Sequence, residues 1–126
     1  METGKEAELT ERIIACALAV HRELGPGLLE SIYEEAMTIE LANEGIPFVR
    51  QLAMPVFYKG IPLSGSFRVD LVVENRVAVE LKAVEAILPV HKAQLLSYLK
   101  LGGWKVGLLF NFKTALLRDG IRRIAI

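Results

Sequence analysis

The segment from Phe67 to Lys82 constrains the fold most, because it reads as two β-branched strands joined by a short turn at 74–76. Side chains alternate between the two faces of a strand. A three-residue turn therefore predicts that Asp70 lies directly opposite Glu80, with Lys82 further along the same face. The other face is hydrophobic and is predicted to join the core: Leu71, Val73, Val77, Val79 and Leu81.

The predicted pairing of Asp70 with Glu80 needs an explanation, because like charges directly opposite each other destabilise a sheet, with Cβ atoms only ~5 Å apart. Two carboxylates and the ammonium of Lys82 on one half-buried face indicate that something binds there. Hard oxygen donors of this kind suit a divalent cation such as Mg²⁺. The alternative is an exposed strand face on which Lys82 makes one ordinary ion pair with a carboxylate.

The length and composition are typical of one soluble globular domain, with 126 residues, 52% of them hydrophobic and 24% charged. We expect a flexible N-terminal tail over residues 1–9 and a single domain over residues 10–126. The apolar run Ile13–Val20 is far too short to span a membrane, and no secretion signal is visible. A cytoplasmic protein follows from these features. Cys16, the one cysteine, is predicted to be a buried, inert thiol.

The charges of the chain cancel, since fifteen basic residues face fifteen acidic ones. This balance argues against a dedicated nucleic-acid coat protein, which usually carries a strong basic excess. It does not exclude a nuclease, because a nuclease site must itself be acidic.

Glycine and proline divide the chain into predicted elements. The expected order is a helix from Thr10, which caps it, to Leu24; a helix over 28–43; an extended segment over 47–58, broken near Pro55; strands near 67–73 and 77–82; a helix over 90–101; and strands over 104–111 and 121–126. The strand–helix–strand order over 77–110 requires a crossover and hence some parallel pairing. We therefore expect an α/β sandwich around a mixed sheet.

Further polar side chains lie on the predicted helices. Glu30 and Tyr33 share one edge of the second helix, and Gln94 and Tyr98 share one face of the third. Each also has an ordinary interpretation: Glu30 is favoured at a helix N-terminus, Gln94 as a solvated residue, and Tyr98 as a core residue with a solvated hydroxyl. Glu34, one turn after Glu30, is an alternative candidate for the same role.

Taken in order, these motifs resemble a known family. In chain order the motifs are Gly27-x-x-Glu30-x-x-Tyr33, Asp70, Glu80-x-Lys82 and Gln94-x-x-x-Tyr98. Together they resemble the GxxExxY family of small bacterial and archaeal proteins, which is assigned to the PD-(D/E)XK nuclease superfamily. The resemblance covers about residues 13–126. It implies a restriction-endonuclease-like αβββαβ core, with a mixed sheet flanked by helices, and a Mg²⁺-dependent phosphodiesterase site in which Mn²⁺ can substitute. Val69 stands where the superfamily motif has proline.

The resemblance also implies a metal site. Asp70 and Glu80 would ligate the ion together with the backbone carbonyl of Leu81. Glu30 would reach the metal through water or help to hold a second ion, and the choice between Glu30 and Glu34 stays open. The bound metal would polarise the scissile phosphate and lower the pKa of a water ligand.

Three further residues receive catalytic roles from the resemblance. Lys82 would position or activate the attacking water, while Gln94 and Tyr98 would orient that water, Lys82 or the nucleic-acid backbone. The implied function is a metal-dependent nuclease that acts on DNA. The alternatives are a catalytically silent nuclease-fold module that binds nucleic acid or a protein partner, and a nuclease that acts on nucleotides or nucleic-acid ends. A chain this small is expected to need a partner, or its own dimer, to grip a duplex.

Overall fold

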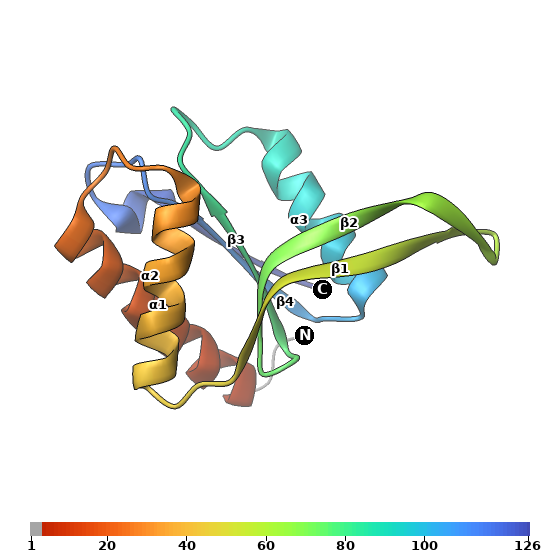
Figure 1. The fold of residues 1–126 in the computed structure, drawn as a ribbon, viewed down its shortest axis with the longest axis horizontal. Coiled ribbons are helices and arrows are strands. Elements are labelled where there is room, and N and C mark those ends of the chain that lie inside the picture. The colour runs from red at the N-terminus through yellow and green to blue at the C-terminus, as the bar shows by residue number, and fades with distance from the viewer. Residues whose placement is uncertain (1–3) are drawn as a thin grey trace.

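The computed structural model describes residues 4–126 and contains an αβββαβ core (Figure 1). Its elements are α1 Gly4–Leu24, α2 Glu30–Asn43, β1 Phe48–Tyr58, β2 Ile61–Val73, β3 Val77–Lys82, α3 Pro89–Gly102, β4 Val106–Asn111, the 3₁₀ turn η1 Leu117–Gly120, and β5 Ile121–Ala125. This order confirms the predicted α/β class. Within residues 4–126, none of the helices combines the length and the apolarity that a membrane span requires.

The strands form one mixed sheet in the order β1-β2-β3-β4-β5. β3 pairs with β4 in parallel, through the crossover that contains α3, and the other neighbouring strands pair antiparallel. The β2–β3 hairpin has the predicted register, with Leu71 opposite Val79 and Val73 opposite Val77. Its turn places Glu74 and Asn75 at φ of 51° and 52°.

Helices cover both faces of the sheet. α1 and α2 pack on one face, where Leu71, Val79 and Phe110 join a core cluster with Met37 of α2. The helix α3 packs on the other face, over a second cluster that includes Val72, Ala78, Leu95, Leu99 and Leu109. The five hydrophobic residues predicted to face inward from the hairpin all lie in the first cluster. Ala78 lies on the α3 face, so strand alternation places Glu80 and Lys82 on that face as well.

The N-terminal helix begins earlier than the sequence suggests. Residues 4–9, assigned to a flexible tail, form the first turns of α1, and residues 1–3 lie outside the described part. The Thr10 hydroxyl donates a hydrogen bond to the Ala7 carbonyl inside the helix, so Thr10 does not cap it. Glu and Ala are good helix formers, and Leu9 is buried in the core, which together extend the helix toward the N-terminus.

β2 is longer than predicted, whereas β1 fills the predicted extended segment over 47–58. β2 begins at Ile61, not near residue 67, and β1 continues through Pro55, with a shift in its register with β2 between Pro55 and Phe57. Proline is tolerated there because β1 is an edge strand whose only neighbour in the sheet is β2. β2 pairs with β3 only over Leu71–Val73 but pairs with β1 along nearly its whole length. The outer parts of both strands therefore extend beyond the rest of the molecule (Figure 1).

The sequence prediction for Cys16 agrees with the structure. Cys16 is buried, and burial, with the charges of Glu40 and Glu44, raises the pKa of its thiol to about 11. The thiol therefore stays protonated at neutral pH.

Candidate functional site

Asp70 and Glu80 lie where β2 and β3 separate. The backbone pairing of the two strands ends at Leu71 and Val79. Beyond that point the backbone amide of Asp70 donates to Glu80 Oε1 at 3.2 Å, and the backbone amide of Leu81 donates to Asp70 Oδ2 at 2.8 Å. Side-chain carboxylates thus replace backbone carbonyls as the hydrogen-bond acceptors at the end of the hairpin.

Both carboxylates resist ionisation in this position. Glu80 is only 5% exposed, and burial, followed by repulsion from the Asp70 charge, raises its pKa to about 8. Burial also raises the pKa of Asp70, and the charges of Glu34 and Glu30 act in the same direction. The Leu81 amide, and to a smaller extent the Lys82 charge, oppose this rise at Asp70. The pair is therefore short of positive charge.

Lys82 lies two residues after Glu80, and its charge favours ionisation of both Asp70 and Glu80. It is half-buried, and across residues 4–126 no ion pair within 4 Å involves it. The ordinary cross-strand ion pair that the spacing allowed is therefore not formed there. The ammonium stays near the two acids without neutralising either of them.

A pocket of about 360 Å³ opens beside Asp70 on the α2 side of the sheet. Glu30 begins α2, and its Oε1 accepts a hydrogen bond of 3.1 Å from the backbone amide of Ala83, next to Lys82. Glu34 lines the same pocket one turn later, but its carboxylate is bound by Arg50 and Gln51. The pocket lining consists of Glu30, Ser31, Glu34, Gln51, Asp70 and Leu81.

Gln51 is a member of this site that the sequence did not single out. It lies across from Asp70 in β1, between the Arg50–Leu71 and Leu52–Val69 pairs. Its side-chain amide donates to Glu34 and, at 3.4 Å, to Asp70 Oδ1. Its φ is +54°, a region that costs a non-glycine residue roughly 1–2 kcal/mol. Strain of this kind is retained mainly where the surrounding contacts fix the residue, which is common at functional sites.

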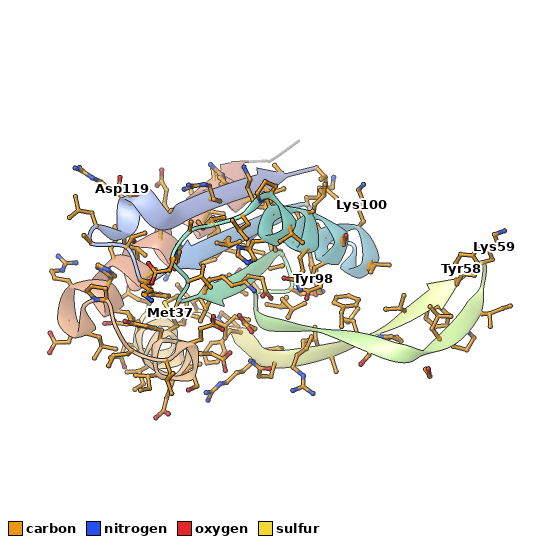
Figure 2. The ribbon with its side chains drawn as sticks, turned by 90° about the horizontal axis from the view of Figure 1, so that it is seen from above. Met37, Tyr58, Lys59, Tyr98, Lys100 and Asp119 are labelled. Atoms are coloured by element: carbon orange, nitrogen blue, oxygen red, sulfur yellow. The ribbon has the colours of Figure 1, made fainter. Side chains whose placement is uncertain are left out.

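Gln94 and Tyr98 lie on the other side of the carboxylates. Tyr98 stacks on Phe67 with ring centroids 4.9 Å apart (Figure 2 labels Tyr98 on α3). Burial, then the charges of Glu80 and Asp70, raises the pKa of the Tyr98 hydroxyl, and a hydrogen bond with Gln94 opposes the rise. Neither Tyr98 nor Gln94 lines the pocket with Glu30. The structure thus gathers Glu30 and Glu34 on the α2 side and Tyr98 and Gln94 on the α3 side, with Asp70 and Glu80 between them.

The donor chemistry of the central pair fits a divalent cation. Over residues 4–126, no three Asp, Glu, His or Cys side chains are already gathered as a complete ligand set. Asp70 and Glu80 nevertheless place two hard carboxylate donors side by side and lack positive charge. The N–H and C=O of one strand residue point to the same side of the strand. Because the Leu81 amide bonds to Asp70 of β2, the Leu81 carbonyl also faces β2. The carbonyl of the next residue, Lys82, points the opposite way and accepts a hydrogen bond from the Phe112 amide. A doubly charged ion at this point would relieve the repulsion between the carboxylates.

Comparison with protein families decides the classification. A family model described as the PD-(D/E)XK nuclease superfamily matches residues 7–124. The chain belongs to the PD-(D/E)XK nuclease superfamily. Searches of curated proteins and of solved structures find no significant match. The narrower resemblance to the GxxExxY family is not tested by this match and stays a prediction.

Membership in the PD-(D/E)XK superfamily agrees with the fold. The mixed five-stranded sheet with helices on both faces is a restriction-endonuclease-like fold, as the resemblance implied. Superfamily nucleases generally act on nucleic acid and use divalent metal ions.

Proposed function

We propose that this chain is a nuclease that hydrolyses phosphodiester bonds in DNA with the help of Mg²⁺, for which Mn²⁺ can substitute. One observation carries the proposal. Glu80 is buried and Asp70 is half-buried beside it, at the end of the β2–β3 pairing, with Lys82 nearby but not paired to either. In a nuclease superfamily, that arrangement is suited to binding a cation and a phosphate at one point.

The carboxylates of Asp70 and Glu80, with the carbonyl of Leu81, would hold the metal. When bound, the ion polarises the scissile phosphate and lowers the pKa of a water ligand. Glu80 must release its proton before it can serve as a ligand, because its pKa of about 8 leaves it mostly protonated at neutral pH. The activity should therefore increase as pH rises toward 8.

Lys82 would compensate negative charge that develops on the phosphoryl oxygens, or position the attacking water, as an ammonium can do without any rearrangement of the backbone. Glu30 lies beside it through the Ala83 amide and would assist at the metal through water. Tyr98 and Gln94 would orient the water, Lys82 or the nucleic-acid backbone from the α3 side. Gln51, which bonds both Glu34 and Asp70, would fix the orientation of the Asp70 carboxylate.

A second candidate function is a catalytically silent module that binds nucleic acid or a protein partner. The observation that favours it is that both oxygens of the Asp70 carboxylate already accept hydrogen bonds, one from Leu81 and one from Gln51. A site closed in this way can persist for structural reasons alone. The two candidates differ in one measurable property, which is turnover in the presence of metal.

Cleavage of supercoiled plasmid in 10 mM Mg²⁺ tests the proposal, with linear duplex DNA, single-stranded DNA and RNA as parallel substrates. The wild-type chain should nick the plasmid, and chelation by EDTA should stop the reaction. Asp70→Ala should abolish cleavage, whereas Asp119→Ala, which removes an exposed acid in η1 that does not line the pocket beside Asp70, should not. Binding without cleavage of any substrate would favour the silent module, and equal cleavage by Asp70→Ala would contradict the assigned site.

A further inference from the structure

The outer parts of β1 and β2 form a two-stranded arm, defined here as residues 52–68. The strands stay paired from Leu52 opposite Val69 to Tyr58 opposite Ile61, beyond the end of the β2–β3 pairing. The inner part rests on the α3 face, where Leu52, Met54 and Phe67 contact the second core cluster. Figures 1 and 2 show the remainder of the arm extending past α3, away from the body of the molecule.

The tip of the arm is apolar and carries one cation. Phe57, Tyr58, Ile61 and Leu63 are between 49% and 64% exposed. The Lys59 ammonium lies 5.4 Å from the centroid of the Tyr58 ring, within the range of a cation–π contact. Both residues are at the far end of the arm in Figure 2. Aromatic side chains this exposed at the end of a projecting ribbon indicate a surface that contacts a partner.

The charge of the arm differs from that of the chain. Between Glu44 and Asp70 there is no Asp or Glu, although the chain has fifteen acidic residues in 126. The same stretch contains Arg50, Lys59 and Arg68, so the rest of the chain carries three more acidic than basic residues. Arg50 is paired with Glu34, whereas Lys59 and Arg68 are exposed and make no ion pair within 4 Å among the described residues. The arm is therefore complementary to a polyanion.

The base of the arm lies at the candidate site. Gln51 directly precedes the arm and bonds Asp70, which follows its other strand by two residues. A polyanion held along the arm would therefore pass close to the carboxylate pair. The geometry thus links a cationic ribbon to the point where a phosphodiester would be cleaved.

We propose that the arm inserts into a groove of duplex DNA, with Lys59 and Arg68 on phosphates and the aromatic tip against sugars and base edges. A two-stranded β-ribbon fits the major groove, which is about 12 Å wide, and contacts to phosphates fix the register of a protein on the duplex. This inference rests on the proposed nuclease function and names the element that would hold the substrate. In a small chain with no net charge, this cationic arm would make the contacts that hold the DNA.

Binding of a fluorescent 20-base-pair duplex to the full chain in EDTA, followed by anisotropy over a series of salt concentrations, tests this proposal without cleavage. Lys59→Glu/Arg68→Glu should weaken binding at least 10-fold and reduce the salt slope by about two, since each phosphate contact contributes about 0.9 to the slope. Arg22→Glu/Arg118→Glu is the matched control. It makes the same change in net charge on exposed residues beside another pocket, between α1 and η1, and should weaken binding less than 3-fold.

Tyr58→Ala provides a milder variant whose folding is easily checked by thermal melting, and it should also weaken binding. Equal losses in the arm and control variants would overturn the proposal. A change from dimer to monomer in sedimentation, with unchanged DNA affinity, would also overturn it and would assign the tip to a second copy of the chain. If the wild-type chain cleaves DNA but the arm variants bind DNA as well as wild type, this inference alone is refuted. If the arm variants lose DNA binding but the wild-type chain cleaves nothing, only the nuclease function is refuted.

Discussion

The backbone amide of Asp70 donates a hydrogen bond to the side chain of Glu80, which brings two acidic residues together. The Leu81 amide returns a hydrogen bond to Asp70, so the pair is held from both strands. This arrangement fixes two acids together at the point where β2 leaves β3. Burial raises the pKa of both, helped at Glu80 by repulsion from Asp70 and at Asp70 by repulsion from Glu34 and Glu30. The properties of the protein that depend on pH and on cations follow from these raised pKa values.

The metal-free protein should lose stability as pH rises through the neutral range. Glu80 has a pKa of about 8 when folded and an ordinary value of 4.5, so between these values the folded state binds more protons than the unfolded state. The free energy of unfolding should then fall by up to about 1.4 kcal/mol per pH unit between about pH 5 and pH 8. Urea denaturation in EDTA at several pH values measures this slope.

Glu80→Gln is the control for that titration, because it keeps the shape of the side chain and removes its charge. The variant should be more stable than wild type at pH 8 and show a much flatter dependence on pH. An unchanged slope in Glu80→Gln would assign the effect to other groups.

Divalent cations should raise the melting temperature, since a ligand that binds only the folded state stabilises it by mass action. The shift in 10 mM Mg²⁺ should be larger at pH 8.5 than at pH 6, because protons compete for Glu80. Asp70→Ala should remove the shift, which differential scanning fluorimetry measures directly. A shift of equal size in this variant would place the cation elsewhere.

Lys82→Ala should separate metal binding from turnover. The ammonium makes no ion pair within 4 Å in the described chain, so its loss should leave the Mg²⁺-induced rise in melting temperature in place. Turnover should fall on the order of 100-fold or more, as when one preorganised electrostatic group is removed from an active site. Undiminished plasmid cleavage by Lys82→Ala would refute the role assigned to this residue.

Gln51→Ala and Gln51→Gly should have the same activity but different stabilities. Both remove the hydrogen bonds to Glu34 and Asp70, so both should lower the rate of cleavage. Only glycine accepts a φ of +54° without strain, so the glycine variant should be about 1 kcal/mol more stable than the alanine variant. Cleavage rates and urea denaturation of the pair test this, and full activity in either variant would show that Gln51 does not position Asp70.

The β2–β3 hairpin could be predicted from the sequence because the residues that determine its turn and register lie close together in the chain. A short turn and a period of two together predict that Asp70 faces Glu80. The structure has the predicted register from Val73 opposite Val77 to Leu71 opposite Val79, and the next step brings the Glu80 carboxylate to the Asp70 amide. The αβββαβ order followed in the same way from hydrophobic runs separated by glycine and proline.

What the sequence could not show depends on pairing between distant segments. Gln51 reads as one polar residue in an extended segment, and its role arises only when β1 lies beside β2 and α2. The first residues of β2 were missed, and a break was expected near Pro55, although an edge strand tolerates proline. The separation of Gln94 from the pocket reflects the placement of α3, which no motif encodes.

Proton release on Mg²⁺ binding tests the central claim most directly. Isothermal titration in two buffers of different ionisation enthalpy gives the number of protons released per ion. A ligand with a pKa of about 8 should release about 0.9 protons at pH 7 and about 0.1 at pH 9. Binding at pH 7 with that release, lost in Glu80→Gln, is the result that we predict. Binding without proton release, or no binding at all at pH 9, would contradict a cation held between Asp70 and Glu80.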